Sequence, residues 1–166
     1  LNSGAELTLT PYFRDTDMEF LQHFLPGQAI EKNAQRSLGL QSAWRKGGLT
    51  LGFDFELTAA ELDEFQPNAT TGIAFLVGTI PAGQHYDYEV DARTAALFGH
   101  YRLEVSDQTE IQVGARLEQV DYDYDNLMLT GRTRDDGTTC GFGGCRFSRP
   151  ADRSDQFTNI SPKISL

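Results

Sequence analysis

Hydrophobic and polar residues alternate strictly along several stretches of this chain. In residues 109–118, apolar side chains such as Val113 and Leu117 occupy odd positions, and polar ones such as Arg116 occupy even positions. Residues 49–57 carry Leu or Phe at every odd position. A period of two places successive side chains on opposite faces of a strand. Both stretches are therefore predicted to be strands with one apolar and one polar face.

The same alternation recurs along the whole sequence and predicts an all-β fold. The segment 59–65 is the exception, because its pattern favours one or two helical turns. The strands are expected at residues 6–14, 38–45, 49–58, 86–105, 109–118 and 160–166.

The connections predict how these strands are arranged. Residues 46–48 and 106–108 form tight hairpin turns, whereas the connections at 15–33, 59–84 and 121–156 are long. In an antiparallel up-and-down meander of about six strands, this order collects the long connections at one end. Outer-membrane barrels show that sorting, with short periplasmic turns and long extracellular loops. The predicted fold is therefore a segment of a transmembrane β-barrel.

Composition agrees with this fold class. The 166 residues are 39% hydrophobic and 23% charged, and they contain no run of the roughly 18 apolar residues that a transmembrane helix needs. Strands escape that requirement because only every second residue meets lipid. The net charge of −10 argues against a nucleic-acid partner, which would need a basic face.

Several stretches resemble the barrel portion of TonB-dependent outer-membrane receptors. The clearest is residues 94–103, which read TAALFGHYRL, followed by the 109–118 strand with its Gly-x-Arg element and by YDYDN at 122–126. The closing stretch 157–166 is similar to a strand that commonly follows in these receptors. Shorter similarities lie at residues 13–17 and 31–40.

The resemblance implies a location in the bacterial outer membrane and a role in active nutrient uptake. The nutrient is most often a ferric siderophore, and the TonB complex supplies energy through a plug region. Neither a plug domain nor a TonB-interacting box is present in residues 1–166. These receptors use 22 strands, so the chain is expected to be a partial barrel of a larger receptor, in contact with outer-membrane lipid.

Two other function classes are weighed against the receptor. A soluble all-β ligand-binding module would also show alternating strands. An outer-membrane enzyme would need a nucleophile with its base, but His23, His85 and His100 are scattered, and no Ser-His-Asp order, HExxH motif or phosphate-binding glycine loop occurs. The chain is therefore not expected to be an enzyme or to carry a cofactor.

The two cysteines, Cys140 and Cys145, are separated by Gly-Phe-Gly-Gly in the last long connection. Cysteines in an exported loop favour a disulfide, and the glycines permit the tight closure. Free thiols are the second interpretation. A metal site is the third, but two thiolates without a nearby His leave zinc coordination incomplete.

The same connection is rich in arginine, which suits an anionic ferric chelate or lipopolysaccharide phosphates. The alternative is a solvated loop in which the charge is balanced by Asp135, Asp136, Asp152 and Asp155. The candidate ligand contacts are Arg132, Arg134, Arg146, Arg149 and Arg153.

The polar residues at alternate positions of the strands form a second candidate set, which is expected to face the lumen or a plug. Asp121, Asp123 and Asp125 also alternate, as oxygen ligands for calcium would, although a strand emerging into solvent explains them equally well. The candidate lumen-facing residues are His100, Arg102, Glu110, Gln112, Arg116 and Glu118.

Overall fold

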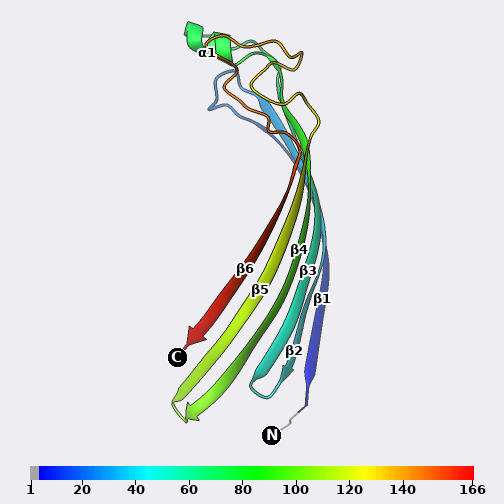
Figure 1. Cartoon of the computed structure of the whole chain (residues 1–166), viewed down its shortest axis with the longest axis vertical. Coiled ribbons are helices and arrows are strands. Elements are labelled where there is room, and N and C mark those ends of the chain that lie inside the picture. The colour runs from blue at the N-terminus through cyan, green and yellow to red at the C-terminus, as the bar shows by residue number, and fades with distance from the viewer. Residues whose placement is uncertain (1–3) are drawn as a thin grey trace.

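The computed structural model describes residues 4–166 and shows one antiparallel sheet of six strands in the order β1-β2-β3-β4-β5-β6 (Figure 1). Every strand pairs with its neighbour in sequence, so the predicted all-β meander is confirmed. One short helix, α1 (Ala74–Thr79), lies in a loop, and no helix of residues 4–166 is long and apolar enough to cross a membrane. The strands are β1 (Glu6–Leu21), β2 (Ile30–Lys46), β3 (Leu49–Gln66), β4 (Gly83–Ser106), β5 (Thr109–Asn126) and β6 (Arg153–Ser165).

The long and short connections lie at opposite ends of the sheet, as the alternation of their lengths predicted. The tight turns β2–β3 and β4–β5 lie at one end, and the loops 22–29, 67–82 and 127–152 lie at the other, where they gather above the strands (Figure 1). Gly47 in the first turn has a φ of +56°, a conformation that glycine adopts without strain.

The strands extend further toward the loops than the sequence predicted, and the long connections are correspondingly shorter. The prediction of helical turns at 59–65 is wrong, because this stretch continues β3 and pairs with β4, for example Glu61 with Glu89. Each face of this stretch mixes apolar and acidic residues, for example Phe65 beside Asp63, so no regular alternation marks it as a strand. Cross-strand backbone hydrogen bonds override the local preference there.

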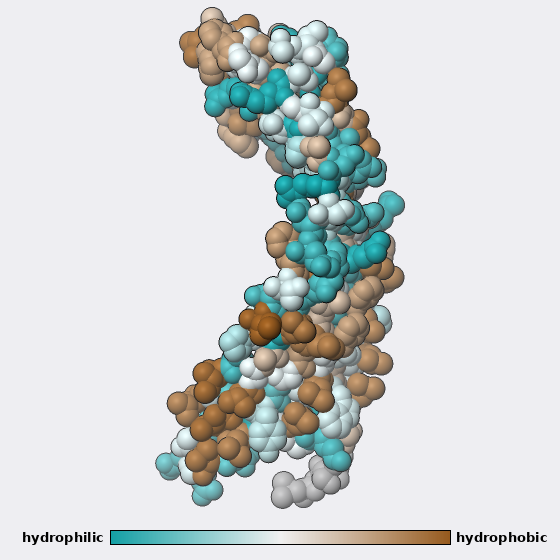
Figure 2. Space-filling view, viewed as in Figure 1, coloured by the Kyte–Doolittle hydropathy of each residue, from teal (hydrophilic) through white to brown (hydrophobic). Residues whose placement is uncertain are grey.

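One face of the sheet is apolar from edge to edge. The register aligns Leu9, Ser42, Phe53, Leu97, Leu117 and Ile160 in a single row across all six strands. Nothing in the described chain covers this face, since Leu9 is 57% and Ile160 is 67% exposed. Apolar side chains gather over the half of the sheet near the tight turns, with polar ones between them and the loops (Figure 2).

This apolar band crosses the register diagonally. Its loop-side edge passes from Phe13 on β1 to Ile160 on β6, whereas the register row of Phe13 reaches Gln156. The turn-side edge steps the same way, through Trp44, Leu49 and Leu103 on β2, β3 and β4. A shift of about four residues at ~3.4 Å each, across five spacings of ~4.8 Å, inclines the strands by about 30° to the normal of the band.

The packed core of the described chain lies among the loops and not on the sheet. Cys140, Cys145 and Phe147 are buried together, with Tyr86 of β4 packed against them. The molecule therefore combines a sheet that is open on both faces with a compact cap at its loop end.

Candidate functional site

The loop 127–152 is tied together by a disulfide. Cys140 and Cys145 form this bond, with their Cα atoms 4.9 Å apart, in agreement with the first of the three interpretations of the sequence. The Arg132 Nε donates a 2.8 Å hydrogen bond to the Cys145 carbonyl. The loop also docks on the neighbouring loop, since the backbone N–H of Arg146 donates to the Thr79 carbonyl. The cap is thus a fixed structure built from two connections.

Arg149 is the internal brace of this cap. It is 1% exposed, and its guanidinium donates hydrogen bonds to the carbonyls of Leu129, Thr133, Arg134 and His85. Burial lowers the pKa of the Arg149 guanidinium, and the carbonyl dipoles take the place of a carboxylate partner. The proposal of Arg149 as a ligand contact is therefore wrong, because its donors are already bound to backbone.

The other candidate arginines are placed differently from one another. Arg146 is exposed at the cap, where it lies 5.7 Å from the centre of the Phe75 ring. Arg153 belongs to β6 and pairs with Asp155 at 2.6 Å. Arg134 shares a short turn with Asp136, whose pKa is lowered by hydrogen bonds from Thr138. The arginines therefore do not form one cluster, and Arg146 borders a cavity.

That cavity has a volume of about 300 Å³ and lies where the three loops meet β3 and β4. Leu25 and Ile80 supply apolar wall, Phe147 supplies an aromatic one, and Arg146 supplies positive charge. Pockets for small ligands combine an apolar lining with a few polar groups in this way. Glu64 also lines the cavity, so its polar groups carry both signs of charge.

A buried polar network forms the floor of the cavity. His85 is 4% exposed, and its Nδ1 lies 3.0 Å from Glu64 Oε1 while its Nε2 lies 2.8 Å from the Pro81 carbonyl. Because a carbonyl only accepts, Nε2 is the donor in its contact with Pro81. Gln22 links Glu64 to Glu31 by donating to both. This network joins three strands and the loop 67–82 beneath the cavity.

The six candidate lumen residues all lie on the polar face of the sheet. Arg116 is central there, donating to Asp54 at 2.5 Å and to Glu118 at 2.8 Å across three strands. Arg102 pairs with Glu110 at 3.0 Å near the tight turn. His100 and Gln112 share this face by register. The face is thus a network of ion pairs opposite the apolar band.

The carboxylates beyond the band lie on the outer side of the sheet. Asp63 stands directly opposite Asp87, and Asp91 stands directly opposite Asp123. Burial raises the pKa of Asp87, and the facing carboxylates of Asp63 and Glu61 raise it further. Within residues 4–166, no three His, Cys, Asp or Glu side chains are grouped as metal ligands, so the calcium interpretation gains no support.

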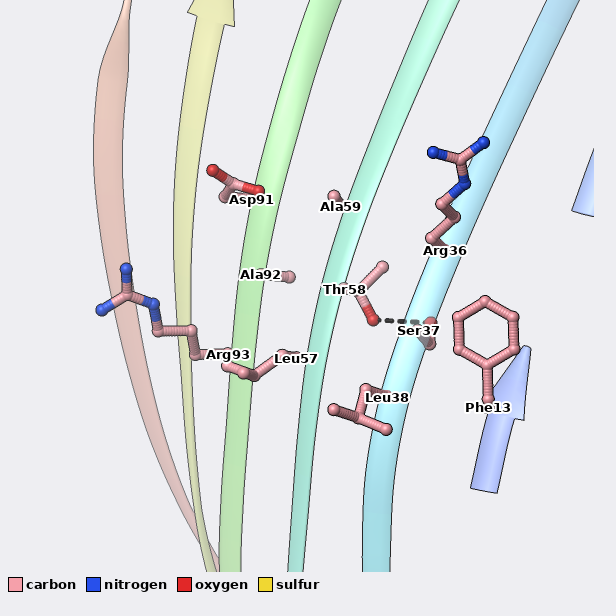
Figure 3. A pocket seen from close by; sticks show the side chains of 10 residues that line it. All are labelled: Phe13, Arg36, Ser37, Leu38, Leu57, Thr58, Ala59, Asp91, Ala92 and Arg93. Carbon is pink, nitrogen blue, oxygen red and sulfur yellow. Dashed lines mark hydrogen bonds between the residues drawn. The ribbon is translucent and has the colours of Figure 1, made fainter. Parts of the chain in front are cut away.

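A shallow groove lies on the outer face, at the loop-side edge of the apolar band. Its volume is about 300 Å³, and Phe13, Leu38 and Leu57 form its apolar part. Arg36 and Arg93 extend on opposite sides of it (Figure 3). The sequence did not reveal this groove, because β2 and β4 are brought together only by the register.

Comparison of the chain with protein-family models, curated proteins and solved structures gave no match.

Proposed function

We propose that this chain is a section of the wall of a TonB-dependent outer-membrane receptor that imports a small nutrient, a ferric siderophore first among them. The observation that carries the proposal is the apolar band, which spans six strands on one face while the other face holds ion pairs. The long loops then face the outside of the cell.

Hydrocarbon is the environment that matches this band. Exposed apolar surface costs roughly 25 cal/mol per Å² in water, and Leu9, Phe13 and Ile160 are each more than half exposed. The stretch 49–57 extends for roughly 27 Å, which at an inclination of about 30° corresponds to a height of about 23 Å. Outer-membrane barrels carry an apolar band of about 25 Å with strands inclined by about 35–45°.

The loop end supports a receptor role. A rigid, disulfide-tied cap over the sheet presents a cavity of about 300 Å³ with Arg146 at its border. An arginine beside apolar walls suits an anionic group, such as a carboxylate of an iron chelate. The resemblance of residues 94–126 and 157–166 to barrel strands of the receptor family points in the same direction.

Spin labels along β3 test the membrane claim. Single variants Phe53→Cys and Phe55→Cys carry the label on the apolar face, and Asp54→Cys and Glu56→Cys carry it on the polar face. Because Cys140 and Cys145 are paired, each variant of this chain offers one reactive thiol. In lipid bilayers we expect the odd positions to collide with oxygen and the even ones with a water-soluble nickel chelate.

The outcome separates the receptor from a soluble all-β module. Water-soluble collisions at all four positions, or protection of all four from both reagents, would contradict a membrane wall. The transport claim has its own test in a bacterium that makes the protein. Disruption of its gene, or of TonB, is expected to abolish energised uptake of a radiolabelled ferric siderophore, and unchanged uptake of every chelate tried would contradict the nutrient assignment.

A further inference from the structure

We propose that Arg36 and Arg93 bind the phosphates of a phosphorylated lipid in the outer leaflet, with the headgroup lying across the groove between them. The proposal rests on the membrane wall proposed above, and it assigns a specific lipid site to the outer face of β2, β3 and β4.

Arg36 and Arg93 lie at matching positions relative to the edge of the apolar band. Arg36 faces Ala59 in one register row, and Arg93 faces Leu57 in the next row toward the tight turns. Arg93 thus lies two strands away from Arg36 and one row closer to the tight turns. The line that joins the two residues is inclined by about 35° to the register rows, and so follows the diagonal edge of the band. Both guanidinium groups therefore lie at one membrane depth, just outside the hydrocarbon, where lipid phosphates are found.

The surface between the two arginines is hollowed. The small side chain of Ala59 lies between two register rows of longer side chains, and the groove of about 300 Å³ opens over it. Leu38 and Leu57 continue the groove into the apolar band, so an acyl chain can follow them (Figure 3). The acyl chain of a lipid would thus contact the apolar band while its phosphate lies beside the arginines, which is the order of these groups in the lipid itself.

Neither arginine is held by a short ion pair within the sheet. Arg36 is largely exposed and has one long ion pair, 3.5 Å to Asp15. Arg93 forms no ion pair with any described residue. Asp91 lines the groove one row closer to the loops, and Asp121 is the register partner of Arg93 on β5, but neither forms an ion pair with Arg93. Both arginines are therefore available for a phosphate group. Guanidinium groups bind phosphate oxygens through pairs of N–H donors.

Lipid retention by the purified protein tests the assignment. Wild type, the Arg36→Gln/Arg93→Gln variant and an Arg14→Gln control are placed in phosphatidylcholine nanodiscs that contain lipid A or its dephosphorylated form. Native mass spectrometry then counts the retained lipid. Arg14 is a matched control because it lies on the polar face of β1. Wild type and control are expected to retain lipid A at least about tenfold better than the double variant does.

Each result has a defined meaning. Equal retention by the double variant, or an equal loss in Arg14→Gln, would overturn the site. Equal retention of the dephosphorylated lipid would also overturn it, and full competition by inorganic phosphate would identify a free-anion site instead. Spin-label alternation along β3 is measured on the same proteins. If alternation persists while retention does not depend on the arginines, the lipid site fails and the membrane wall stands; if alternation is absent, the wall itself fails.

Discussion

The phenol ring of Tyr12 lies flat over Gly39, its direct partner on the neighbouring strand. A Cβ atom on Gly39 would fall 2.2 Å from the Tyr12 ring. The ring reaches across β2 in this way and its hydroxyl donates to Glu56 on β3. The side chain of Phe98 lies over Gly52 by the same arrangement. Glycine thus allows aromatic rings to lie along the polar face, and the pairs fix the register.

Substitution of Gly39 by alanine is expected to destabilise the sheet. The new methyl group would displace the Tyr12 ring and separate it from Glu56. Overpacking of this kind costs roughly 1–3 kcal/mol. The measurement is urea-induced unfolding in detergent micelles. In a Tyr12→Ala background, where no ring covers the glycine, the same substitution is expected to cost much less; equal costs in the two backgrounds would show that the contact does not restrain the register.

Removal of the Arg149 brace is expected to loosen the loop 127–152 while the sheet stays intact. The variant Arg149→Met fills a similar space but removes the side-chain donors to the carbonyls of Leu129 and Thr133. Each buried, unsatisfied acceptor costs about 1–3 kcal/mol. Hydrogen exchange should rise in this loop and remain unchanged in β2 and β3. The surface variant Arg153→Met is the control, and equal protection in the two variants would contradict the role of Arg149.

The disulfide is expected to act locally. A ring this short constrains the unfolded chain by roughly 2 kcal/mol on the loop-entropy model. The double variant Cys140→Ser/Cys145→Ser should therefore expose the loop to protease cleavage near Gly143 and leave spin-label alternation in β3 unchanged. A loss of alternation would mean that the disulfide supports the sheet as well as the loop.

The sequence predicted the strands where apolar and polar residues alternate, and it failed where each face mixes the two kinds of residue. Residues 109–118 alternate strictly and are recognisable as a strand. The stretch 59–66 does not alternate, although its residues also pair with β4. The residues of the polar face were predicted from their alternate positions alone. Alternate residues of a strand share one face whatever its register with the neighbouring strand. The internal role of Arg149 was missed because an arginine that binds backbone carbonyls and the Thr133 hydroxyl within a loop has no sequence signal. The groove between Arg36 and Arg93 needed the register itself, which depends on three strands at once.

The carboxylates beyond the apolar band are expected to make stability depend on pH. Asp87 faces Asp63 on the neighbouring strand, and burial together with this repulsion raises the pKa of Asp87 in the folded protein. An acid with a raised folded pKa binds its proton more tightly when folded, so stability falls as pH rises through that range.

Asp87→Asn removes this loss without changing the size of the side chain. The variant should be more stable than wild type at neutral pH by about 0.2–1 kcal/mol, the range for like charges on facing strands. The gain should shrink as pH falls below the ordinary range of a carboxyl, where Asp87 is protonated in both states. Unfolding in urea at a series of pH values measures the difference, with Asp107→Asn in the exposed β4–β5 turn as the control. A gain that is independent of pH would show that the substitution acts through packing and not through charge.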